Sequence, residues 1–186
     1  MESQPHIDTL SSGLPRAVIE AAFIIMLLAA VCSCVPVNTW MLFHIPVTTG
    51  LINTLGMVVL YYAILRGMKG LSHPLTVLWW IAIGMNLLGF ILYCFGEAAS
   101  GVSAVVATTL PIIYLPLGIL LIVWYRGNLC QVGIWMIVRI LVVNLVPVLF
   151  YVSGLMEHSW GITVMDVITI GVEIWYAWTL RSVLVN

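Results

Sequence analysis

Charged residues are scarce in this chain of 186 residues. It has six Lys and Arg and seven Asp and Glu, which together make up 7% of the sequence, whereas 63% of its residues are hydrophobic. The mean hydropathy is +1.17. A soluble domain of this size would need a charged surface that the sequence does not provide. The composition therefore excludes an ordinary soluble protein and indicates a membrane protein.

Motifs that would place chemistry outside a bilayer are also missing. The segments between apolar runs are too short for a nucleotide-binding or catalytic domain, there is no CxxC motif, and no basic cluster is suited to phosphate groups. We expect no cofactor and no nucleic-acid partner. We also expect no metal site, because the polar residues of the outer loops lack ligand spacing. These residues are His44, Glu97, Glu157 and His158.

Six apolar runs fill most of the chain, and each is long enough to cross a bilayer, which takes roughly 20 residues of helix. Helices satisfy their own backbone hydrogen bonds, as lipid demands. The sequence therefore predicts an all-α polytopic bundle of six transmembrane helices, forming one domain over residues 17–186 after a short polar tail, 1–16. The predicted spans are approximately 17–36, 46–66, 75–97, 102–126, 132–154 and 162–184.

Five of the six basic residues fall on one side of this arrangement, and the opposite loops contain none. They are Arg16, Arg66, Lys69, Arg126 and Arg181. Because Lys and Arg are retained on the cytoplasmic side, both termini are predicted to be cytoplasmic. The sixth, Arg139, lies inside the fifth span. The even-numbered spans end alike in aromatic residues followed by Arg, as in 61–66 and 175–181, which fits an interfacial belt better than a threefold repeat.

Polar residues at membrane depth are the candidates for a functional site, because each is costly there. Asp166, Thr169, Glu173 and Tyr176 are spaced by three, four and three residues, which places them on one helical face. Glu173 is near the middle of its span. Asn86 in the third span and Asn144 in the fifth lie at a similar depth, so together with Glu173 they predict a polar layer at the midplane.

Arg139 needs an acidic partner, and two are available. A straight-helix estimate places Arg139 about one turn closer to the cytoplasm than Glu173, at 1.5 Å per residue, so Glu20 is an equally good partner. In the alternative interpretation, these residues only hold helices together. Pro111 and Pro116 interrupt the fourth span and favour a cavity through helix kinks.

Cysteines at the outer ends of the spans leave one question open. Cys32, Cys34 and Cys94 share a level and could pair in an oxidising compartment, although buried cysteine acting as a small hydrophobic residue is the favoured interpretation.

Several segments resemble a family of bacterial membrane proteins. These are Leu117–Leu121, the Trp-Tyr-Arg-Gly sequence at 124–127, the short loop into the fifth span, and the aromatic end of the last span before Leu180 and Arg181. With the spacing of the spans, they resemble an uncharacterised bacterial family of six-helix integral membrane proteins, a domain of unknown function. The resemblance implies a bacterial inner membrane or an equivalent membrane, and it supplies no catalytic residues.

Three functions fit these features. The first is the binding or transport of a small or lipophilic solute at the midplane polar layer. The second is an intramembrane enzyme acting on a lipid or isoprenoid, with Glu173 or Asp166 as general acid. The third is an accessory subunit of a membrane complex. We favour the first, with Arg139 among the ligand-binding residues. The expected partners are membrane lipids and the solute, and a homo-oligomer or a second membrane protein stays open.

Overall fold

The computed structural model describes residues 5–32, 45–68, 73–94 and 100–185. It contains six long helices and one short 3-10 turn. They are α1 (Arg16–Cys32), α2 (Ile45–Gly67), α3 (His73–Cys94), α4 (Ser100–Trp124), α5 (Asn128–Val152), η3 (Leu155–Glu157) and α6 (Ser159–Leu184). No strand occurs in these segments beyond one isolated bridge, between His6 and Arg126. The all-α prediction with six helices is confirmed.

Three segments of this fold are long and apolar enough to cross a membrane. They are Pro74–Leu92, Asn128–Val152 and Trp160–Leu184, and within the apolar 18-residue stretch of each only 28%, 22% and 17% of the residues are buried. Apolar surface exposed on this scale is unusual for a soluble protein. The structure is therefore compatible with a membrane protein, although three helices of the described chain meet this criterion rather than the six that were predicted.

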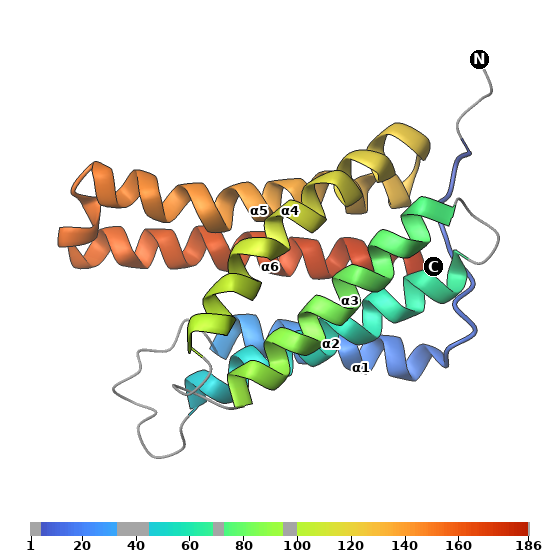
Figure 1. Cartoon of the computed structure of the whole chain (residues 1–186), viewed down its shortest axis with the longest axis horizontal. Coiled ribbons are helices and arrows are strands. Elements are labelled where there is room, and N and C mark those ends of the chain that lie inside the picture. Colours follow the sequence, from blue (N-terminus) through green and yellow to red (C-terminus); the bar gives the residue numbers. More distant parts are fainter. Residues whose placement is uncertain (1–4, 33–44, 69–72, 95–99, 186) are drawn as a thin grey trace.

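Neighbouring helices in the sequence are neighbours in space. Each helix packs against the next, and α6 packs back against α1 and α2, so the six helices form a closed circuit. The side chains that fill its centre are fully buried, and the largest are Trp79, Tyr61 and Tyr176. The hairpin of α5 and α6 extends past the other helices, and α4 bends along its length (Figure 1). Pro111 and Pro116 lie inside α4 and account for the bend.

Two glycines allow α4 and α5 to cross closely. A Cβ added to Gly133 would lie 2.6 Å from the carbonyl oxygen of Gly118, and one added to Gly118 would lie 3.0 Å from that of Gly133. Both glycines are buried. Small residues at such crossings let helix backbones approach each other, as is common in membrane bundles.

Residues 5–15, the N-terminal strap, lie across one end of the bundle. The amide of Ile7 donates to the carbonyl of Arg126 at 3.0 Å, and that of Leu10 to Val183 at 2.7 Å. A Cβ on Gly67 would be 2.7 Å from that of Leu10. The strap therefore contacts the ends of α2, α4 and α6 beside the start of α1. Alternate helices run in opposite directions, so that α2, α4 and α6 all end beside the strap. The tail expected over 1–16 is thus packed against the helices over its described part.

Candidate functional site

A cluster of buried aromatic and polar side chains occupies the centre of the bundle. The hydroxyl groups of Tyr61 (α2) and Tyr176 (α6) are hydrogen-bonded at 2.5 Å. Trp79 (α3) donates from Nε1 to the carbonyl of Tyr61 at 2.8 Å. All three side chains are fully buried. This bonding satisfies polar groups that would otherwise destabilise the interior, and it joins three helices at one point.

Asn86 connects this centre to α4. Its Nδ2 donates to the carbonyl of Ala82 at 2.7 Å and to the hydroxyl of Tyr114. The ring of Tyr114 meets that of Tyr61 edge to face, with centroids 6.1 Å apart. Asn86 and Tyr114 are both buried. Tyr114 therefore joins the cluster from the bent helix, between its two prolines.

Arg139 and Glu173 form an ion pair beside this cluster. Nε of Arg139 donates to Oε1 of Glu173 at 2.7 Å, and the two side chains are 19% and 16% exposed. The guanidinium carbon lies 5.5 Å from the centre of the Tyr176 ring, which adds a cation–π contact. Of the two acidic partners considered for Arg139, the structure has Glu173. For straight helices, Arg139 was expected to lie about one turn closer to the cytoplasm than Glu173. The long side chain of Arg139 spans that distance.

The carboxylate of Glu173 is only partly satisfied. Oε1 accepts from Arg139, whereas Oε2 is buried and has no hydrogen-bond partner in the described part of the chain. A buried acceptor without a donor costs about 1–3 kcal/mol. The ion pair is therefore not the fully bonded arrangement expected of a bridge that serves stability alone.

A cavity of about 240 Å³ opens between α4 and α5 next to the ion pair. Its apolar lining is Leu110, Pro111, Ile140 and Val143. Three polar side chains complete the lining: Tyr114, Arg139 and Asn144. Val143 and Asn144 are exposed on the surface of α5, so the cavity reaches the outside of the bundle. An apolar pocket with a few converging polar groups is the usual form of a small-molecule site.

Of the other residues predicted for the site, Asn144 is at the cavity, whereas Thr169 and Asp166 are not among the residues that line it. Asn144 lines the cavity, and its Nδ2 also donates to the carbonyl of Ile140 at 2.8 Å. Thr169 donates to the carbonyl of Met165 at 3.0 Å, within its own helix. Asp166 is half-buried and lies seven residues from Glu173, or about 10 Å along the helix. The structure thus brings Tyr176, Glu173, Arg139 and the cavity together, without Asp166 or Thr169.

Glu20 belongs to a second ionic cluster, at the end of the bundle that carries the strap. Arg181 (α6) donates from Nε and Nη2 to the two carboxylate oxygens of Glu20 (α1) at 2.7 and 2.6 Å. Its guanidinium also lies over the rings of Phe23 and Trp178, at 5.4 Å from each centroid. Arg16 approaches Glu20 to 3.6 Å. This bidentate bond closes the circuit of helices between α1 and α6.

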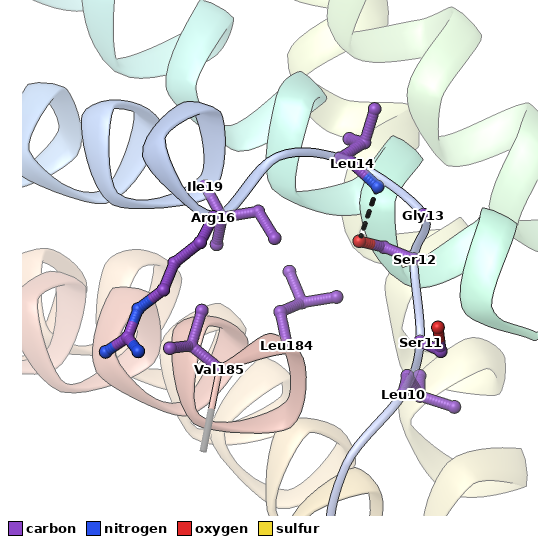
Figure 2. Close-up of a pocket in the computed structure, with 9 residues that line it drawn as sticks. All are labelled: Leu10, Ser11, Ser12, Gly13, Leu14, Arg16, Ile19, Leu184 and Val185. Carbon is purple, nitrogen blue, oxygen red and sulfur yellow. Dashed lines mark hydrogen bonds between the residues drawn. The ribbon is translucent and has the colours of Figure 1, made fainter.

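A second cavity, of about 270 Å³, lies between the strap and the ends of α1 and α6. Figure 2 shows Ser11, Ser12 and Gly13 on the strap side, with Leu184 at the end of α6 and the following residue, Val185, facing them. Its charged side chain, Arg16, is 69% exposed and extends away from Ser12 (Figure 2). The hydroxyl of Ser12 accepts from the amide of Leu14 at 3.2 Å. Because its polar groups are exposed or already bonded, this cavity is the weaker candidate.

Sequence reasoning included Tyr176 among the site residues but missed two other tyrosines of the cluster, Tyr61 and Tyr114. Tyr61 was assigned to an interfacial belt, yet its side chain is completely buried. Tyr114 was not singled out at all, and its position between Pro111 and Pro116 was the available signal. Of the residues considered for metal or disulfide chemistry, Glu157 and His158 are exposed and Cys32 carries a free thiol. His44, Cys34 and Glu97, and the side chain of Cys94, lie outside what the structure describes.

This chain matches no protein-family model, no curated protein and no solved structure. The comparisons therefore do not bear on the resemblance to bacterial six-helix membrane proteins, and function has to be argued from the geometry.

Proposed function

We propose that this chain is a polytopic membrane protein with six spans and both termini in the cytoplasm, and that it binds or transports a small lipophilic solute. The observation that carries the proposal is the cavity between α4 and α5, with Arg139, Tyr114 and Asn144 in an otherwise apolar lining. The basic residues near the strap support the orientation. Residues of the outer half of the α5–α6 hairpin, such as Leu149 at 63% and Val152 at 77% exposure, support contact with lipid.

The size and position of the cavity indicate what it can hold. Its volume of about 240 Å³ is below the roughly 300–1,000 Å³ of drug-sized sites, so it suits a small molecule or the polar head of a larger one. Val143 and Asn144 place its opening on the apolar outer surface of α5. A lipophilic solute can therefore enter from the bilayer and keep its apolar part in lipid.

Transport or binding is favoured over the intramembrane enzyme by the composition of the cavity wall. None of the described residues that line the cavity is a carboxylic acid. Glu173 is held behind Arg139, and Asp166 lies about two turns away along α6. A general acid must come within hydrogen-bond reach of the reacting group, and neither residue faces this space.

The test is whether a solute copurifies and depends on this cavity. Val143→Trp would fill the cavity, whereas Leu141→Trp places the same side chain on the same helix outside the lining; the two native residues are 40% and 45% exposed. We expect native mass spectrometry in mild detergent to find a bound small molecule in the wild-type protein and in Leu141→Trp, but not in Val143→Trp. Equal occupancy in all three, or bulk phospholipid alone in the wild type, would contradict the proposal.

A further inference from the structure

The positions of Arg139 and Glu173 relative to the cavity limit the charge of the solute. Arg139 lines the cavity and Glu173 does not. The bond to Glu173 uses Nε, which is one of five N–H donors on a guanidinium. The planar guanidinium matches the geometry of a carboxylate or a phosphate. Arg139 is the one cation among the described residues of the lining, which favours a singly charged carboxylate. An anionic group in the cavity would therefore meet the cation directly, with Glu173 on its other side.

Charge balance then requires a second event. The ligand-free ion pair is neutral, but a bound carboxylate would leave two anions around one cation. An uncompensated charge at this depth is costly, on the order of 2.5–3.5 kcal/mol on the most lenient scale. A proton taken up by Glu173 removes the excess charge. Oε2 is the oxygen available for it, because Oε1 is bonded to Arg139 and Oε2 has no partner among the described residues.

The groups around Glu173 favour this exchange. Arg139 forms an ion pair with it from α5, and the ring of Tyr176, which is on the same helix as Glu173, contacts the guanidinium of Arg139. Tyr114 from α4 lines the same cavity as Arg139, and Tyr61 from α2 is hydrogen-bonded to Tyr176. Glu20 does not share this site, because it is paired with Arg181 two turns further along α6. Glu173 is thus the carboxyl group among these neighbours that can accept a proton when Arg139 changes partner.

We propose that the cavity binds a lipophilic monocarboxylic acid as its anion together with one proton. This inference rests on the proposed function and specifies its ligand. In the binding step, the carboxylate of the ligand accepts hydrogen bonds from Arg139, the Arg139–Glu173 ion pair breaks, and a proton from water binds Oε2 of Glu173. The site is neutral before and after the step. A transport cycle built on it moves acid and proton together, without net charge.

The probes are benzoate and its uncharged analogue benzamide, titrated by calorimetry into the wild-type protein in nanodiscs of zwitterionic lipid. Buffers of different ionisation enthalpy count the protons. We expect about one proton taken up per benzoate, so that the affinity falls about tenfold per unit of rising pH, and weaker binding of benzamide. Glu173→Gln should bind benzoate without proton uptake and without pH dependence, and Arg139→Gln should lose the preference for benzoate.

Further measurements separate the possible failures. An infrared band of a protonated carboxyl group that appears when benzoate binds the wild-type protein tests the step even where Glu173→Gln does not fold. Proton-independent benzoate binding, equal affinity for both probes, or binding of neither overturns the inference. If both probes bind equally and both are lost in Val143→Trp, the proposed binding function stands without its acid specificity. If Val143→Trp changes neither, the proposed site itself is wrong.

Discussion

Replacing Gly133 with alanine should destabilise the crossing of α4 and α5. The new Cβ would lie 2.6 Å from the carbonyl oxygen of Gly118 and 2.8 Å from Cβ of Leu121, whereas ordinary contact begins at 3.4 Å. The backbone at both sites is helical and packed, so neither neighbour can rotate away. The helices would have to separate by about 0.8 Å, the difference between these distances.

The size of the effect follows from that separation. A gap of about 0.5–1 Å forfeits a quarter to a half of the attraction between atoms that were in contact, and overpacking typically costs about 1–3 kcal/mol. Gly171 on α6 is the matched control, because a Cβ there meets no atom of the described residues within 4 Å. Gly171→Ala should therefore gain about 0.5–1 kcal/mol from helix propensity alone.

The assay is reversible unfolding in mixed micelles with increasing SDS, followed by the fluorescence of the eight Trp residues. We expect Gly133→Ala to unfold at lower SDS than the wild type and Gly171→Ala at the same or higher SDS. Gly133→Ala should also bind the proposed solute less well, since α4 and α5 form the cavity. Equal stability of the two variants would show that the crossing is looser than the structure describes and refute this reasoning.

Two further predictions concern the strap and the buried tyrosines. Gly127 has φ +78° and ψ −150°, a conformation nearly restricted to glycine, and a Cβ there would be 2.8 Å from the carbonyl oxygen of Ile7. Gly127→Ala should therefore speed amide hydrogen exchange in the strap. Gly154 also has a positive φ but no described atom within 4 Å of an added Cβ, so Gly154→Ala should not change exchange in the strap. Tyr61→Phe should lower the free energy of unfolding by about 1–3 kcal/mol, because it leaves the hydroxyl of Tyr176 without the hydrogen bond to Tyr61. Replacing both Tyr61 and Tyr176 with Phe should recover most of that loss in the same SDS titration. An additive loss in the double variant would contradict the hydrogen-bond explanation.

The helices could be predicted from the sequence because apolar run length is a local property. The span predicted at 132–154 corresponds to Asn128–Val152, and that at 162–184 to Ser159–Leu184. The strap could not be predicted in the same way. Its polar residues show no periodicity, and its position depends on contacts with distant glycines, Gly67 and Gly127. Only the folded chain brings those partners together.

The sequence indicated which residues could belong to the site, but it did not indicate which of them pair with each other. Arg139 and Glu173 stood out because charge is rare in an apolar run, but the choice between Glu173 and Glu20 depended on helix rotation and on the reach of a flexible side chain. Tyr61 shows the opposite error. An aromatic residue close to a basic one at the end of a span is usually interfacial, whereas here a hydrogen bond to Tyr176 allows the side chain to be buried.

The arrangement around Arg139 argues against a purely structural role for the ion pair. Replacing both members of a buried pair with well-packed apolar residues is often neutral or stabilising, so stability alone is a weak reason to keep one. The clamp between Glu20 and Arg181 has the form expected of a structural bond, because both carboxylate oxygens accept hydrogen bonds. The pair of Arg139 and Glu173 leaves one oxygen without a donor among the described residues and exposes its cation to a cavity. An ion pair in which the carboxylate is only partly hydrogen-bonded and the cation faces a cavity is suited to a ligand that binds and dissociates.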